Sequence, residues 1–193
     1  MTFQPQAKRI ILPELDEIDF GPAADGTPLE EARRRTNLLW AAWAGGDAAA
    51  RTPGGESLEE ISARLAAAIS RLVGPAGCGG GGSAVAVTHS ALLRVLLAAA
   101  LSNPAAAAAT GAAEGGGGDW LRGDPRGWDL LSARRIPQDN CCINVLDFPA
   151  RAVSGQGRAP APAAVRLVGF SRHVGPPVEV EVARAGRRRV VTT

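Results

Sequence analysis

One of the chain's two histidines lies where an apolar run ends and a helical pattern begins, in the string VAVTHSALLR at residues 85–94. Residues 84–87 are short, apolar and partly β-branched, which is typical of a buried parallel strand, and leucines recur at helical spacing after Ser90. We therefore expect His89 at the carboxyl edge of a sheet, where open α/β folds bind ligands. The unpaired N–H groups of residues 90–92 favour phosphate or carboxylate. A hydrogen-bonded core histidine is the alternative, and this segment alone supports both interpretations equally.

The elements around His89 predict an α/β unit. Ser57 and Glu60 form a capping box before an amphipathic helix over residues 57–73, and the glycine run at 79–82 connects this helix to the strand before His89. Another helix is expected at 29–43, with Trp40 and Trp43 as packing residues. Its inner side should contain Leu29, Ala32, Leu39 and the two tryptophans.

Short strands are expected elsewhere in the chain. Arg9–Leu12 is a short apolar strand ended by proline, and residues 141–148 alternate as a strand whose partner is 165–170. Residues 178–182 also alternate, but their place in a sheet is open. Residues 104–127 are a low-complexity surface insertion, and the arginine-rich residues 184–193 are a solvated basic tail.

Composition limits the class of protein. The 193 residues fit a single domain, and their 46% hydrophobic content agrees with a soluble globular protein. A net charge of +2 gives no reason to expect nucleic acid as a partner. The three cysteines form neither a disulfide framework nor a metal-ligand spacing, and no signal peptide or membrane span is evident. We expect a cytoplasmic protein with reduced thiols.

Four strings occur in a familiar order: LDEIDFG at 15–21, PGGES at 53–57, VTHSALLR at 87–94 and NCCINVL at 140–146. They are similar to a family pattern of approximately L-x-E-x-x-[FY]-G, G-G-E-S before a helix, [ST]-H-[GS]-x-x-[LI]-R, and N-[CST]-[ST]-[IV] opening a late strand. Over roughly residues 9–172 the chain thus resembles the histidine phosphatase superfamily, the phosphoglycerate mutase-like proteins. The resemblance implies an α/β three-layer sandwich with a mainly parallel sheet, truncated at its N-terminus.

The resemblance also implies roles for single residues. In this family one histidine of an R-H-G motif attacks phosphorus, and a second histidine holds the phosphoryl oxygens. His89 matches the second histidine, with Ser90 beside it as a phosphate-binding residue. Glu17 matches the carboxylic acid that protonates the leaving oxygen and then takes a proton from water; without the resemblance it is an exposed loop carboxylate. We interpret Glu56, Arg64 and Arg94 as structural, and expect no metal or cofactor.

The nucleophile motif of the family is missing from this sequence. The 193 residues contain no Arg-His-Gly, and the strand leading to Glu17 comes a few residues after Met1. We expect either a gene model truncated at its 5′ end or a natural remnant. Arg172-His173 follows a strand, so a circular permutation would restore the motif in principle. However, Val174 stands where the motif has glycine, and His173 is interpreted as a terminal surface residue.

The expected function is therefore phosphomonoester hydrolysis or phosphomutase chemistry by family, with little or no turnover in this chain. The partner would be a small phosphorylated substrate or phosphate, with neither nucleic acid nor membrane. One alternative is a non-catalytic remnant that binds a phospho-ligand or a partner. Another is a purely structural interaction domain. A sheet that lacks its first strand exposes edges and apolar surface, which predicts marginal stability or self-association.

Overall fold

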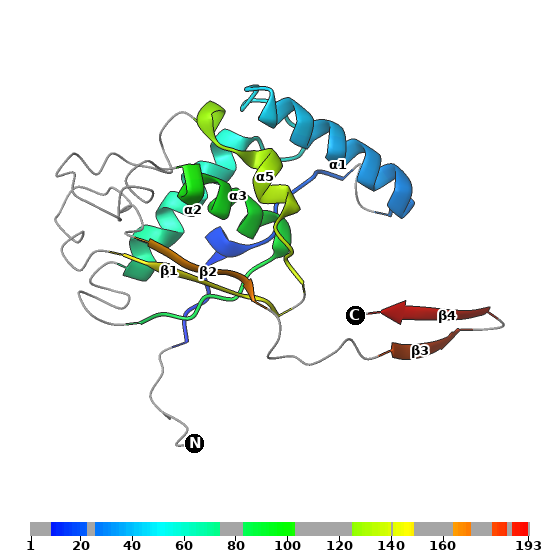
Figure 1. The fold of residues 1–193 in the computed structure, drawn as a ribbon. Coiled ribbons are helices and arrows are strands. Elements are labelled where there is room, and N and C mark those ends of the chain that lie inside the picture. Colours follow the sequence, from blue (N-terminus) through cyan, green and yellow to red (C-terminus); the bar gives the residue numbers. More distant parts are fainter. Residues whose placement is uncertain are drawn as a thin grey trace, which may run out of the picture.

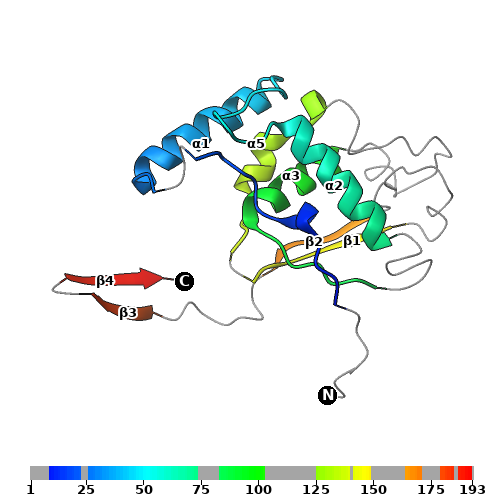
Figure 2. The same cartoon turned by 180° about the vertical axis from the view of Figure 1, so that it is seen from behind.

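The computed structural model describes residues 9–22, 26–73, 83–102, 125–139, 141–148, 164–170, 179–184 and 187–192. Helices gather on one side of a two-stranded sheet, as Figures 1 and 2 show from opposite directions. No helix among these residues is long and apolar enough to span a bilayer. The elements in chain order are η1 (Pro13–Leu15), α1 (Leu29–Ala44), α2 (Leu58–Val73), α3 (Ser90–Ser102), η3 (Pro125–Gly127), α5 (Leu130–Arg135), β1 (Ile143–Asp147), β2 (Ala164–Phe170), β3 (Glu179–Arg184) and β4 (Arg187–Thr192).

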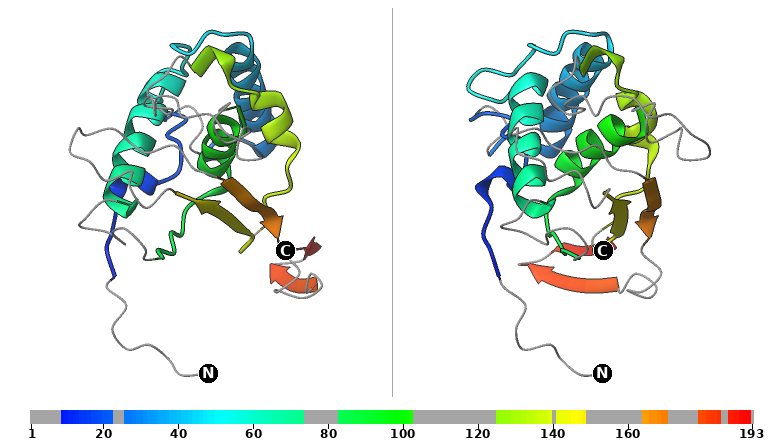
Figure 3. Two further views of the ribbon diagram at one scale, coloured as in Figure 1. Left: turned by 60° about the vertical axis from the view of Figure 1, so that its left-hand side comes forward. Right: turned by 90° about the vertical axis from the view of Figure 1, so that its left-hand side faces the viewer.

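Helices α2 and α3 supply most of the core. On α2 the predicted apolar stripe is buried, and α3 is buried along most of its length. Helix α5 packs against α3, and Figure 3 shows α3 lying between α5 and α2. The buried residues of α2 and α3 with large apolar side chains are Leu58, Ile61, Leu65, Ile69, Leu92, Val95, Leu96 and Leu97.

The tryptophans of α1 are packing residues, as predicted. Their rings meet edge to face with centroids 5.4 Å apart, and both are buried. The indole N–H of Trp43 donates to the Ala50 carbonyl at 2.8 Å, which satisfies its polar atom inside the core. The prediction for Leu29 was wrong, because it lies in the first turn of α1 and is 63% exposed.

The sheet differs from the mainly parallel one that we expected. Strand β1 pairs with β2 and β3 pairs with β4, and both pairings are antiparallel. The partnership of β1 with β2 was predicted correctly. Antiparallel strands can be neighbours without a helical crossover between them. The parallel sheet that we expected needs a strand beside residues 83–88, and none of the described strands pairs with that segment.

Two expected strands are unpaired extended segments. Residues 83–89 run extended into α3 without a strand partner among the described residues, and Val85 and Val87 are 93% and 88% exposed. The prediction of a buried strand at 84–87 was therefore wrong for this structure. Arg9–Leu12 likewise pairs with none of the described strands; Leu12 is buried and Pro13 begins η1.

Several sequence predictions fall partly or wholly outside the described residues. These include the glycine connector at 79–82, most of the insertion at 104–127, and His173. The insertion ends with η3, and the basic tail, expected to be a solvated end, contributes strand β4.

The capping box of α2 forms as predicted. The Ser57 hydroxyl accepts from the Glu60 N–H at 3.2 Å, and the Glu60 carboxylate accepts from the Ser57 N–H at 2.9 Å. Arg51 also pairs with Glu60 at 2.9 Å. The Ser57 N–H, assisted by Arg51, holds the pKa of the Glu60 carboxyl below its ordinary value of 4.5.

Glycines allow the loop before α2 to touch the loop after η1. Gly21 has φ +77°, and a Cβ there would lie 2.9 Å from the Gly55 nitrogen and against the Pro53 carbonyl oxygen. A Cβ at Gly55 would lie 2.8 Å from the Asp19 oxygen. The two backbones can approach this closely only because neither position carries a side chain.

We predict that Glu60→Gln destabilises the protein at pH 7 but not at pH 3. A depressed pKa in the folded state means that the carboxylate stabilises the fold above about pH 4.5 and that this is lost as the pH falls through the folded value. Because the pair is half exposed, the loss at pH 7 should be at most about 1 kcal/mol. Urea unfolding at both pH values measures it. Glu59→Gln, in the same first turn, is the control and should show a smaller pH dependence.

We predict that Gly21→Ala destabilises the protein more than Gly26→Ala does. Gly26 has φ +70°, but an added Cβ there would have no atom within 4 Å, so its substitution reports backbone strain alone, about 1 kcal/mol. Gly21→Ala adds a clash with backbone atoms and should cost roughly 3 kcal/mol or more. Thermal and urea unfolding of the two variants measure the difference. Equal losses would mean that the two loops are not held in contact.

Candidate functional site

The predicted anion site lies at the first turn of α3. The Leu93 N–H donates to the His89 carbonyl at 3.0 Å, so His89 occupies the position that caps the helix. The N–H groups of Ser90 and Ala91, which follow it, have no acceptor among the described residues. Free amide groups at a helix start attract anions.

Glu17 reaches this turn from a distant part of the chain. Its carboxylate oxygen Oε1 accepts from the Leu92 N–H at 3.1 Å and from the Ile18 N–H at 3.0 Å. The structure thus brings Glu17 to the first turn of the helix that His89 caps. One detail differs: the Leu92 N–H, which we expected to be open to a ligand, is already bonded to a carboxylate.

The other side chains of this turn are open. His89 and Ser90 are exposed and Arg94 is half-buried, and none of the three has a hydrogen bond or ion pair with the described part of the chain. His89 is therefore not a hydrogen-bonded core histidine. Arg94, interpreted as a structural brace, has no partner of that kind either.

A polar clamp holds the loop that carries Glu17. The Arg64 guanidinium of α2 pairs with the Glu56 carboxylate, Nε to Oε1 at 2.7 Å and Nη2 to Oε2 at 2.9 Å. The same guanidinium donates to the carbonyls of Glu14, Asp16 and Glu17, at 2.9, 2.8 and 3.3 Å. Glu56 also makes two hydrogen bonds with the backbone of Asp19: its Oε2 accepts from the Asp19 N–H, and its N–H donates to the Asp19 carbonyl at 2.8 Å. We call residues 14–19 the clamped loop.

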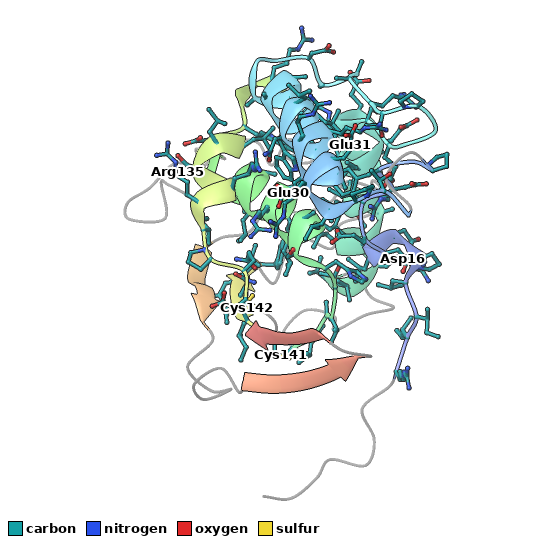
Figure 4. All side chains as sticks on the ribbon, turned by 90° about the vertical axis from the view of Figure 1, so that its right-hand side faces the viewer. Asp16, Glu30, Glu31, Arg135, Cys141 and Cys142 are labelled. Carbon is teal, nitrogen blue, oxygen red and sulfur yellow. The ribbon has the colours of Figure 1, made fainter. Side chains whose placement is uncertain are left out.

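Two further contacts tie the clamped loop to its neighbours. The Thr88 hydroxyl, one residue before His89, donates to the Leu15 carbonyl. Arg71 of α2 pairs with Glu14 at 2.8 Å, and a hydrogen bond from the Glu14 N–H, together with this pairing, lowers the pKa of the Glu14 carboxyl. Figure 2 shows η1, which begins this loop, against α2, and Figure 4 labels Asp16 on its outer side. The loop is thus held by α2 and by the segment entering α3.

The sequence identified the two ends of this arrangement but not its middle. Glu17 and His89 stood out from their motifs, and Glu56 and Arg64 were interpreted as structural. Nothing in the sequence indicated that Arg64 binds backbone carbonyls or that Thr88 contacts Leu15, because such contacts depend on which loop the fold places beside the donor.

The described residues offer no other site of this kind. They contain no group of three or more histidine, cysteine, aspartate or glutamate side chains that could hold a metal ion. Cys141 and Cys142, labelled in Figure 4 just before β1, are free thiols. The Cys142 thiol donates to Gln138 at 3.1 Å, within a local hydrogen-bond network that includes Asn144. These residues belong to the start of β1 and not to the clamped loop.

Comparison with known proteins identifies a family. A family model described as histidine phosphatase superfamily (branch 1) matches residues 3–132. No match was found among curated proteins or among solved structures. The matched range includes the clamped loop, the Glu56–Arg64 pair and the first turn of α3. Because the match covers more than half of the chain, the protein belongs to the histidine phosphatase superfamily.

Proposed function

We propose that the first turn of α3 binds the phosphoryl group of a small phosphorylated molecule or free phosphate. The supporting observation is that the N–H groups of Ser90 and Ala91 and the exposed side chain of His89 beside them have no hydrogen-bond partner in the described part of the chain. A helix start with free amides attracts phosphate, and a cationic imidazole beside it adds a charged donor. Membership of a phosphatase superfamily gives the same ligand class.

In this proposal Glu17 is the proton carrier. Its carboxylate lies on the next N–H of the same turn, at Leu92, so a phosphoryl group on Ser90 and Ala91 would be its neighbour. In its acid form the Glu17 carboxyl can give its proton to the leaving alcohol oxygen when a nucleophile attacks phosphorus and the P–O bond breaks. The carboxylate can then accept a proton from the water that attacks phosphorus and releases phosphate from the nucleophile.

We further propose that this chain turns over substrate weakly or not at all. A covalent route needs a nucleophile that attacks phosphorus, and the family's Arg-His-Gly motif does not occur in the 193 residues. His89 in this proposal holds oxygens, and Glu17 moves protons, so neither replaces the nucleophile. The alternative function is a non-catalytic binding module that keeps the same anion site.

The remaining parts of the proposal concern architecture and partners. The family match supports the three-layer, mainly parallel arrangement typical of the family, although both strand pairings among the described residues are antiparallel. The free thiols of Cys141 and Cys142 suit the reducing cytoplasm. Because Val85 and Val87 are exposed on an extended segment that has no strand partner among the described residues, we also propose weak self-association through this edge.

We predict that inorganic phosphate at pH 6 stabilises the wild type and that His89→Ala weakens phosphate binding roughly tenfold or more. A hydrogen bond to a charged group contributes about 1.5–3 kcal/mol, and histidine can be cationic near this pH. Phosphate at 100 times its Kd should raise the free energy of unfolding by about 2.7 kcal/mol. Thermal unfolding across a phosphate series measures this, and equal affinity in both proteins would refute the site.

Phosphate release from an aryl phosphate by the same proteins distinguishes an enzyme from a binding module. We expect phosphate release orders of magnitude below that of an intact site, with phosphate-dependent stabilisation retained. His173→Ala is the control and should bind phosphate as the wild type does. Robust turnover abolished by His173→Ala in a folded variant would assign the nucleophile to Arg172-His173. Turnover insensitive to both His89→Ala and Glu17→Gln would refute the family site.

We predict a concentration-dependent dimer that the double substitution Val85→Lys/Val87→Lys removes. Lysines on a strand edge oppose pairing with another chain through charge repulsion and solvation. Light scattering after size exclusion gives the mass at each concentration. Leu38→Lys on α1, where Leu38 is 67% exposed, is the matched control and should still dimerise. A wild type that stays monomeric throughout would contradict the proposal.

A further inference from the structure

We propose that Arg64 is a positioning residue for Glu17: it fixes the backbone of the clamped loop so that the Glu17 carboxylate reaches the first turn of α3. The significance of this role for proton transfer rests on the proposed function. The positioning itself depends on two sets of contacts: those of Arg64 with the loop carbonyls, and that of Glu17 with the Leu92 N–H. Arg64 touches neither His89 nor the N–H groups of the turn in the described contacts.

The guanidinium of Arg64 uses its whole donor set on this task. An arginine side chain has five N–H groups in a planar fork, and the structure gives Arg64 five hydrogen bonds, two to Glu56 and three to loop carbonyls. The side chains of Arg64 and Glu56 are only 17% and 22% exposed, so water competes weakly for these groups. A lysine has three donors on one nitrogen and cannot reproduce the fork.

The clamp holds the chain on both sides of Glu17. Arg64 binds the carbonyls of Glu14, Asp16 and Glu17 itself, and Glu56 binds both backbone groups of Asp19. With the backbone held before, at and after Glu17, few side-chain torsions remain to be fixed for its carboxylate to reach Leu92. The contact of the Glu17 carboxylate with the Leu92 N–H, at 3.1 Å, should therefore depend on Arg64, although the described hydrogen bonds of Arg64 go to Glu56 and the clamped loop and not to α3.

Arg71 provides a matched control on the same helix. It also binds the clamped loop, through the Glu14 carboxylate at 2.8 Å, but it is 52% exposed, and its only described bond is to that side chain. Arg71→Lys alters the ion pair between α2 and the loop without releasing the loop carbonyls. A general loosening of the loop on α2 would affect both arginine variants, whereas the positioning role is specific to Arg64.

The test follows the Leu92 amide resonance of the full chain in a ¹⁵N-labelled sample at pH 7. Glu17→Gln defines where this resonance lies when no carboxylate accepts from it. We expect Arg64→Lys to move the Leu92 resonance from the wild-type position to the Glu17→Gln position, and Arg71→Lys to leave it in place. Core amides of α2 and α3 report whether each variant remains folded.

Glu56→Gln keeps the proposal testable if Arg64→Lys does not fold. It retains an acceptor for the Asp19 N–H but removes the charge that holds the guanidinium, so the Leu92 resonance should again shift toward the Glu17→Gln position. An unmoved Leu92 resonance in a folded Arg64→Lys variant, or in Glu56→Gln when Arg64→Lys is unfolded, overturns the positioning role. An equal shift in Arg71→Lys overturns its specificity.

This readout needs no substrate and no phosphate. If the Leu92 resonance behaves as expected but phosphate fails to stabilise the protein, the positioning role stands and the proposed function fails. If phosphate binds but the Leu92 resonance ignores Arg64, the proposed function stands and the positioning role fails.

Discussion

The ion pair between Arg64 and Glu56 is the interaction on which the described arrangement depends. It joins the start of α2 to the clamped loop, which lies much earlier in the sequence. The two side chains bind backbone groups of that loop, which are present whatever the side chains there are. Replacing one member of a buried pair leaves a charge without its partner and costs about 3–5 kcal/mol; at the partial exposure of this pair the cost should be lower. The glycine contacts between the same two segments place the backbones close enough for the clamp to close.

The clamp has a consequence for the electrostatics of α3. The positive end of a helix can favour one anion strongly, and here the protein supplies that anion itself, as Glu17 on the Leu92 N–H. The two preceding N–H groups, beside His89, have no acceptor among the residues that the structure describes. A phosphoryl group bound to them would share the helix start with a carboxyl, which is an arrangement suited to moving a proton between them. The same contacts join the loop to α2 and hold the backbone around Glu17, so variants of the clamp should affect both stability and the proposed phosphate site.

Residue spacing within each helix predicted the helices, whereas the strand pairing and the contacts of the clamp depend on tertiary neighbours. The capping box of Ser57 and Glu60 and the stripe along α2 follow from spacing within one helix, and both formed. The apolar string at 84–87 shows which residues favour burial, but burial also needs a neighbouring strand, and Val85 and Val87 are exposed without one among the described residues. The interest of Glu17 and His89 came from the family motifs, and the structure places both at the first turn of α3. The five bonds of Arg64 had no sequence signal, because backbone carbonyls are the same at every position.

The most direct test is a crystal structure of the protein grown or soaked with tungstate, a heavy oxyanion that stands in for phosphate. Tungstate should lie on the N–H groups of Ser90 and Ala91 with the His89 imidazole beside it. The Glu17 carboxyl should lie at the same turn, and Arg64 should hold both Glu56 and the loop carbonyls. Tungstate bound elsewhere, or a Glu17 side chain directed away from α3 with the clamp intact, would contradict the assignment of this turn as the phosphate site.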